Sequence, residues 1–225
     1  MDELLGSTNT NPALIQGVVI ALVSDNKDPK NLGRMKVRYP LLHSNLESGW
    51  VRMVSFMAGK DRGGYFLPEV DDEVLVAFQF GNINTPYVIG ALYSGVDSPS
   101  QNNEDGKNNI REIKSRSGHV IRFDDKSSAE KIEIIDKTGN NKIMISSDDN
   151  TISISTDQDI KVEALKGTVA VSGQDIKLKG SNSISLNASE ISIKADSSLS
   201  LQSGSSTDIK AGGSVSVEGI SINLN

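Results

Sequence analysis

The chain has 225 residues, a formal net charge of −6 and no cysteine. Its length allows one or two domains, and the lack of cysteine excludes a disulfide framework and a thiolate metal site. Residues 1–109 hold 9 basic and 13 acidic side chains, and residues 110–225 hold 14 and 16. Neither part contains a basic block, so nothing in the charge pattern favours binding to nucleic acid or to anionic lipid.

Residues 1–16 are expected to be a flexible lead-in. The first six residues, MDELLG, lack the basic and apolar regions of a secretory signal peptide. No apolar run approaches the 18 residues that a membrane-spanning helix needs. We therefore expect a soluble species, made in the cytoplasm without a signal peptide.

Residues 17–95 are predicted to form a small β-barrel. Five segments have the apolar patterns of strands, at residues 17–23, 34–40, 50–54, 73–78 and 87–93. Nine of the ten aromatic residues lie between Tyr39 and Tyr93, as expected for a conventional core. The spacing of the five strands favours a barrel of the oligonucleotide/oligosaccharide-binding (OB) type, with a glycine loop at residues 60–64.

A polar linker and a β-rich transition region follow the barrel. Residues 96–109 have no apolar periodicity and are predicted to be the linker. Residues 110–150 contain alternating runs, and Thr138-Gly139-Asn140-Asn141 between two of them is predicted to be a hairpin turn.

Residues 151–225 contain an internal repeat with a period of about eight residues. In each unit two apolar residues are separated by one polar residue, which places both side chains on one face of a strand. Polar residues and glycines between the pairs indicate sharp corners, so the segment predicts about ten short strands around a narrow apolar interior. The predicted core residues are Ile152, Ile154, Ile160, Val162, Ile176, Leu178, Ile184, Leu186, Ile191, Ile193, Leu199, Leu201, Val215 and Val217; the pairs Val169/Val171 and Thr207/Ile209 continue the series.

Three copies of this repeat are expected to wind together. A monomeric β-solenoid would have only about three coils here, which is near the minimum for a stable repeat array. In a homotrimer the apolar pairs would meet on the three-fold axis instead. The predicted fold is therefore all-β, with an N-terminal OB-type barrel followed by a triple-stranded, intertwined β-helix. The regular pairing argues against a third possibility, a disordered tail.

Several blocks of the barrel resemble one family. These blocks are Gly17-Val18-Val19, Asp28-Pro29-Lys30-Asn31-Leu32-Gly33-Arg34, Trp50-Val51-Arg52, Gly64-Tyr65-Phe66-Leu67-Pro68, and Pro86-Tyr87-Val88-Ile89-Gly90. Their order and spacing resemble the OB domain in the central spike of contractile tails, which includes phage baseplate assembly protein V, VgrG of type VI secretion and the spikes of extracellular injection systems. Residues 113–143 also look like the region that joins barrel and needle in VgrG-type spikes.

The resemblance implies a structural spike that is driven through a target envelope when a sheath contracts, with purely mechanical contact to the membrane. It also implies assembly into a phage-tail-like particle. Since the barrel starts near Gly17, a separate hub protein is expected at the barrel end. A PAAR-type tip protein is expected on the C-terminal end, in contact with Ile220, Ile222 and Leu224. The alternative is a trimeric β-helical adhesin that binds carbohydrate, which would need exposed aromatic residues on the rod; none follows Phe123.

Enzymatic function is not expected, and neither are a cofactor or a metal site. Of the two histidines, His119 is interpreted as a strand residue rather than a catalytic base. The acidic residues 71–73 are interpreted as a turn before a strand rather than as a metal cluster or a carboxylate pair. The barrel half is too acidic for a single-stranded nucleic acid groove, so Arg34, Lys36, Arg38 and Arg52 are assigned to ion pairs or to a protein partner.

The predicted phase of the repeat can be tested by two neighbouring substitutions. Ile184→Asp should abolish trimer assembly, because three carboxylates on the axis would be desolvated at a cost on the order of several kcal/mol each. Ser185→Asp, on the outward side, should leave assembly unchanged. The yield of trimer from size-exclusion chromatography is the measurement, and equal yields would show that the assigned phase is wrong.

Overall fold

The computed structural model describes residues 14–43 and 46–223, and within them all regular structure except one short 3-10 turn is β. That turn, η1, spans Gln79–Gly81. The all-β prediction is thus confirmed. No helix in the described ranges is long and apolar enough to cross a bilayer. The chain divides into two compact units, and the boundary lies between Lys161 and Val162.

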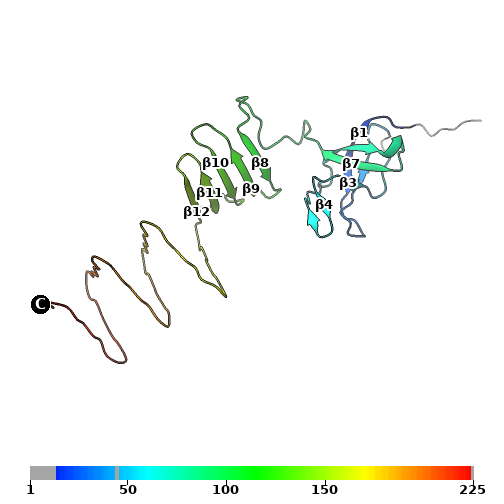
Figure 1. The fold of residues 1–225 in the computed structure, drawn as a ribbon. Helices are drawn as coiled ribbons and strands as arrows, with labels where there is room; N and C mark the ends of the chain where they lie inside the picture. Colours follow the sequence, from blue (N-terminus) through cyan, green and yellow to red (C-terminus); the bar gives the residue numbers. More distant parts are fainter. Residues whose placement is uncertain (1–13, 44–45, 224–225) are drawn as a thin grey trace, which may run out of the picture. The chain divides into compact units, whose positions relative to one another are not determined.

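The first sheet is the predicted barrel. Its strands are β1 (Val18–Asp25), β2 (Lys36–Arg38), β3 (Arg52–Met53), β6 (Glu73–Phe78) and β7 (Pro86–Ala91), in the order β2-β1-β6-β7-β3 (Figure 1). Met35, just before β2, and Val51, just before β3, exchange two backbone hydrogen bonds of 3.0 and 2.7 Å. This bridge joins the two ends of the sheet and so removes its open edges.

The barrel interior is filled by alternate residues of its strands. Val74, Val76 and Phe78 of β6 point inward while the residues between them are half-buried, as the period of two for a strand requires. The buried residues form one cluster: Ala21, Val23, Met35, Val37, Tyr39, Val51, Val74, Val76, Phe78 and Val88. The barrel therefore has a complete core within a single chain.

Asp28 fixes the loop between β1 and β2. Its carboxylate accepts backbone hydrogen bonds from Lys30 and Leu32, both at 3.0 Å, and two bonds of 2.8 Å from the Arg34 guanidinium. The bidentate pair is the strong geometry for an arginine and a carboxylate. The hydrogen bond from Arg34 is the main reason that the pKa of Asp28 is well below its usual value.

The segment predicted as a glycine loop is instead a small hairpin. Its strands are β4 (Ala58–Gly59) and β5 (Arg62–Gly63), and Asp61 in the turn has a φ of 54°. A side chain on Gly63 (φ 141°) would come within 2.4 Å of the Met57 carbonyl oxygen, so only glycine fits there. The composition indicated the turn but not the short pairing that flanks it.

A second sheet is an antiparallel meander of five strands in the order β12-β11-β10-β9-β8 (Figure 1). The strands are β8 (Ile110–Lys114), β9 (Val120–Asp124), β10 (Lys131–Ile135), β11 (Lys142–Ser146) and β12 (Thr151–Ser155). The predicted hairpin turn lies between β10 and β11, where Gly139 has a φ of 77°. The prediction of this turn is confirmed.

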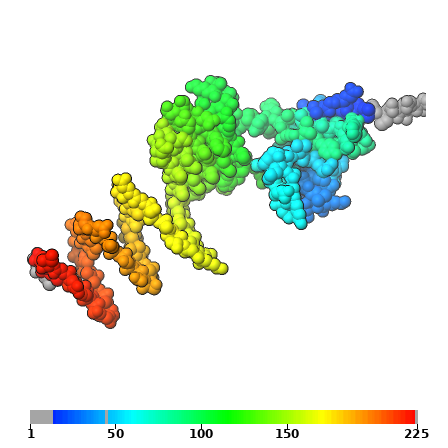
Figure 2. Space-filling view, viewed as in Figure 1, coloured from blue at the N-terminus to red at the C-terminus, as the bar shows by residue number. Residues whose placement is uncertain are grey.

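The repeat differs from the sequence-based expectation of about ten strands. Only its first pair, Ile152 and Ile154, lies on a strand, β12; residues 156–223, all of which the structure describes, contain none. In Figure 2 the yellow-to-red segment is a narrow strip of atoms. The physical reason is that a strand is defined by hydrogen bonds to a neighbour, and this segment has no neighbouring strand within its own chain.

The Asp28 clamp predicts a pH-dependent contribution to stability. Asp28→Asn should lower the urea midpoint of the barrel at neutral pH, because an amide cannot provide the charge that Arg34 pairs with. The lowered pKa means that this stability is present above the ordinary carboxyl value of 3.8 and is lost as the pH falls toward the folded-state value. The fluorescence of Trp50, the single tryptophan, reports the transition.

Asp61→Asn is the matched control, since it removes a carboxylate from an exposed turn where asparagine tolerates positive φ. The difference between wild type and Asp28→Asn should shrink as the pH falls below about 4. A difference that stays constant down to strongly acid pH would show that the charge of Asp28 contributes nothing.

Candidate interface between copies of the chain

One face of the second sheet is an exposed apolar surface, here called the apolar face. It contains nine large apolar side chains whose exposed fractions run from 39 to 72%. They are Ile113, Ile121, Phe123, Ile132, Ile134, Ile143, Ile145, Ile152 and Ile154. An apolar surface of this extent on a soluble protein marks an interaction site rather than ordinary surface.

The register of the strands gathers these side chains into two rows. Ile113 faces Ile121, which faces Ile134, and the row continues through Ile143 to Ile154. The second row runs through Phe123, Ile132, Ile145 and Ile152 in the same way. Because directly opposite residues on paired strands share a face, the alternation in each strand builds one continuous surface.

The opposite face of the same sheet is held by ion pairs. Arg122 lies directly between Glu112 and Glu133 across three strands and contacts their carboxylates at 2.8 and 3.8 Å. Glu133 is only 2% exposed and is also contacted by Lys142 at 2.5 Å and Lys131 at 3.4 Å. Every charge in this network has a partner of opposite sign.

The electrostatics of Glu133 follow from these contacts. Burial raises the pKa of its carboxyl group, but the hydrogen bond from Lys142 and the charges of Lys131 and Lys142 outweigh burial and leave the pKa lowered. The pKa of Glu112 is lowered against the same opposing effect of burial, by hydrogen bonds from Ser100 and Arg122. Both groups stay ionised at neutral pH, so this face carries a connected network of charges.

The apolar side chains of the repeat are also exposed to solvent. The side chains predicted to form the trimer core, from Ile152 to Val217, are between 52 and 74% exposed in the single chain. Of the predicted tip contacts, Ile220 is fully exposed and Ile222 is half exposed, while Leu224 lies outside the described residues. The structure thus places the predicted residues on the surface, and it does not bring them together.

The sequence analysis placed the first residue of the candidate interface at Ile152, whereas in the structure the apolar face begins at Ile113. The signal was present in the sequence, because Ile132/Ile134 and Ile143/Ile145 have the same spacing as the later pairs. Without the register it could not be known that all of them share one face.

The residues considered for catalysis lie at or just before the first residues of strands. No group of three or more His, Cys, Asp or Glu side chains in the described ranges could hold a metal ion. His119 was predicted to be a strand residue, but it lies one position before β9, where its Nδ1 accepts a hydrogen bond from the Lys137 backbone. Asp71 lies in a turn with a φ of 74° and Glu73 begins β6, so the prediction of a turn before this strand is confirmed.

Basic side chains of the barrel are engaged within the chain. Arg34 pairs with Asp28, and Arg38 contacts Asp71 at 3.0 Å. The two others are Lys36, which lies 3.7 Å from Glu47, and Arg52, which donates to the Tyr87 hydroxyl. The expectation of ion pairs is confirmed for Arg34, Lys36 and Arg38.

Comparison with known proteins finds a family match for the barrel. Residues 19–93 match the family described as the Type VI secretion system/phage-baseplate injector OB domain. The Type VI secretion system spike proteins VgrG2a and VgrG2b of Pseudomonas aeruginosa are each 29% identical to this chain over 101 residues. The match covers 41% of this chain but only 12% and 10% of the two relatives, so the chain spans a small fraction of their length. The predicted OB-type barrel and its resemblance to VgrG-like baseplate spikes are confirmed.

Two adjacent positions on β12 test whether the apolar face is covered in solution. Ile154 and Ser153 are both exposed in the single chain but point to opposite faces of the sheet. If copies associate through the apolar face, Ile154→Lys should prevent association, because burying three ammonium groups costs on the order of several kcal/mol each. Ser153→Lys should have no effect. Light scattering measures both, and equal masses for the two variants would show that the face stays open to water.

Proposed function

We propose that this chain, whose residues 19–93 match the injector OB domain family, is the structural spike of a contractile injection machine or phage tail baseplate. The homology of the barrel to VgrG spike proteins supports a structural role in a baseplate or spike complex. The observation that carries the proposal is the apolar surface of residues 113–222, which one chain leaves exposed. A spike built from several copies would cover it.

The assembly that fits this surface is an intertwined homotrimer. A monomeric solenoid would pair its strands within one chain, whereas residues 156–223 contain no strand. In the trimer each strand of the repeat would pair with strands of its neighbours, and the apolar pairs would meet on the axis. Each buried isoleucine or leucine would then contribute roughly 1.5–3 kcal/mol. With so many pairs in series, the needle would separate only cooperatively.

The mechanism is mechanical. Contraction of a sheath would drive the needle through the target envelope, and contact with the membrane would be purely mechanical. Paired strands around a dry, close-packed interior resist deformation, since protein interiors have low compressibility. No catalysis and no cofactor enter this function, and the chain is proposed to be made in the cytoplasm and then built into a phage-tail-like particle.

Two partners complete the proposed spike. A separate trimeric hub protein would bind the barrel end, with residues 1–16 near the contact. A PAAR-type tip protein would sit on the C-terminal end of the needle, over the exposed side chains of Ile220 and Ile222 and over Leu224. Unpaired strand edges and an open apolar core favour such a cover.

Analysis of the purified chain and of the native particle tests the proposal. Light scattering should give three times the chain mass of 24.1 kDa. The particle should contain sheath and tube proteins, with hub and tip proteins that co-purify with the spike. Deletion of residues 218–225 should remove binding of the tip protein and leave the trimer intact. A monodisperse monomer, or a particle whose spike joins the tube without an intermediate protein, would contradict the assembly proposed here.

A further inference from the structure

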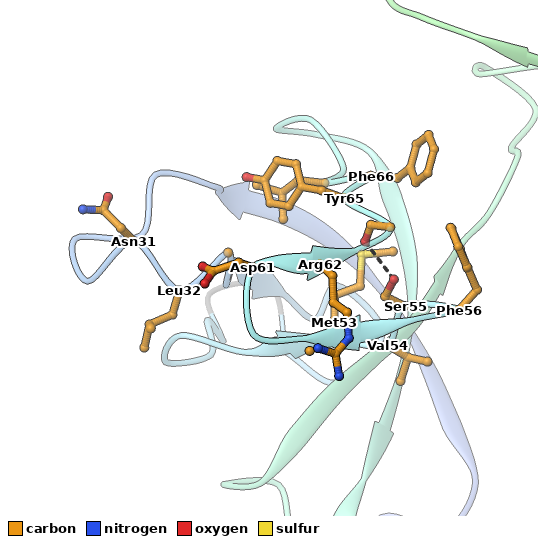
Figure 3. A pocket seen from close by; sticks show the side chains of 14 residues that line it. Asn31, Leu32, Met53, Val54, Ser55, Phe56, Asp61, Arg62, Tyr65 and Phe66 are labelled. Carbon is orange, nitrogen blue, oxygen red and sulfur yellow. Dashed lines mark hydrogen bonds between the residues drawn. The ribbon is translucent and has the colours of Figure 1, made fainter. Parts of the chain in front are cut away.

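The barrel carries an open groove of about 620 Å³ beside the β4–β5 hairpin (Figure 3). One wall is the β1–β2 loop with Asn31 and Leu32, and the other is the segment from Met53 to Leu67. Figure 3 shows Phe56 and Phe66 at one end of the groove and Asn31 and Leu32 at the other. The sequence-based analysis assigned no role to these aromatic residues.

The aromatic side chains of the groove are exposed, and two of them contact each other. Phe56 is 81%, Tyr65 75% and Phe66 59% exposed, and the rings of Phe56 and Phe66 lie 6.3 Å apart. A side chain on Gly64 would come within 2.2 Å of the Phe56 ring, so this glycine leaves room for it. The Ser55 hydroxyl, 2.8 Å from the Gly64 carbonyl oxygen, ties the two sides of the segment together.

The groove continues into the apolar face. Phe66 lines the groove and also a second hollow of about 750 Å³, which is otherwise lined by the second sheet and the residues just after it. Ile113, Ile121 and Ile134 of the apolar face line that hollow. Three residues after Phe66, Glu69 forms a 3.0 Å ion pair with Arg116 of the β8–β9 turn. The aromatic end of the barrel and part of the apolar face therefore line two hollows that share Phe66.

We propose that the Phe56–Phe66 end of this groove is a second contact between copies of the chain, which closes the barrel end of the apolar core. This inference rests on the proposed trimer. A partner that covers the apolar face also reaches Phe66, because the side chain lines the same hollow. Rigid, exposed aromatic residues are typical of the centre of protein interfaces, where they bury area at little entropic cost.

The charged residues that line the groove favour a second copy of the chain, rather than a polyanion, as its binding partner. Asp61 and Arg62, which line it together, have opposite charges and provide no basic track for nucleic acid. Three copies related by a three-fold axis would bring three Phe66 rings to the point where the apolar core ends. An aromatic plug there would shield the core from water at the end away from the tip.

Cross-linking of single cysteines tests the contact, since the chain has no cysteine of its own. The full chain with Phe66→Cys or Met57→Cys is treated with a short bis-maleimide and run on a denaturing gel. Met57, half exposed beside the groove, leaves all three aromatic rings in place. Both variants should give covalently linked dimers, since a bis-maleimide joins two thiols and each chain carries one. Asn84→Cys, on an exposed loop outside the groove, should remain monomeric on the gel.

Ile184→Cys on the predicted axis separates failure of this inference from failure of the trimer. If Ile184→Cys links chains and neither Phe66→Cys nor Met57→Cys does, the groove contact is wrong and the trimeric needle stands. If none of the three links chains, the proposed trimer is wrong as well. Linkage of Asn84→Cys to the same extent as Phe66→Cys would show a non-specific encounter and would also overturn the inference.

Discussion

The structure depends on one constraint, which is that this chain has more ordered apolar surface than it can bury. From Ile113 to Ile222 isoleucine, leucine and valine recur at alternate positions of extended backbone, so that pairs of them share a face. In the second sheet they form a continuous surface that is about half exposed, and in the repeat they are exposed still further. Burial of such surface is the main favourable term in association. In the proposed trimer this surface would become part of a hydrophobic core shared by several chains.

The barrel, in contrast, buries its own apolar side chains. Its sheet closes through the Met35–Val51 bridge, and its core residues are almost fully buried within one chain. Asp28 and Arg34 fix the loop that forms one wall of the groove. The barrel thus has its own buried core, whereas the segment that follows it leaves its apolar side chains exposed. This difference between the barrel and the segment after it is consistent with the proposed spike, which would be held at one end and driven forward at the other.

The two faces of the second sheet differ in chemistry, and this difference indicates which face a partner chain would cover. Glu133 is almost fully buried, but it has three cationic partners, so a partner protein is not needed to satisfy it. If all three cations were removed, a buried charge would be left uncompensated, which is strongly unfavourable. The apolar face has no such network. The apolar face does carry an ion pair between Arg111 and Asp125, since Arg111 is opposite Phe123 in the register, but most of its surface is apolar.

The sequence by itself determined the all-β class, the five barrel strands, the turn at Gly139 and the spacing of the apolar pairs, because these follow from local alternation and turn chemistry. It did not determine the β4–β5 hairpin, the position of His119 before β9, or the extension of the apolar face back to Ile113. Those depend on which strands pair and in what register, and register is a non-local property. The tertiary structure alone decided that Phe66 of the barrel lies against the same hollow as Ile121 and Ile134. The local pattern fixes which side chains share a face, and only the fold brings separate faces together.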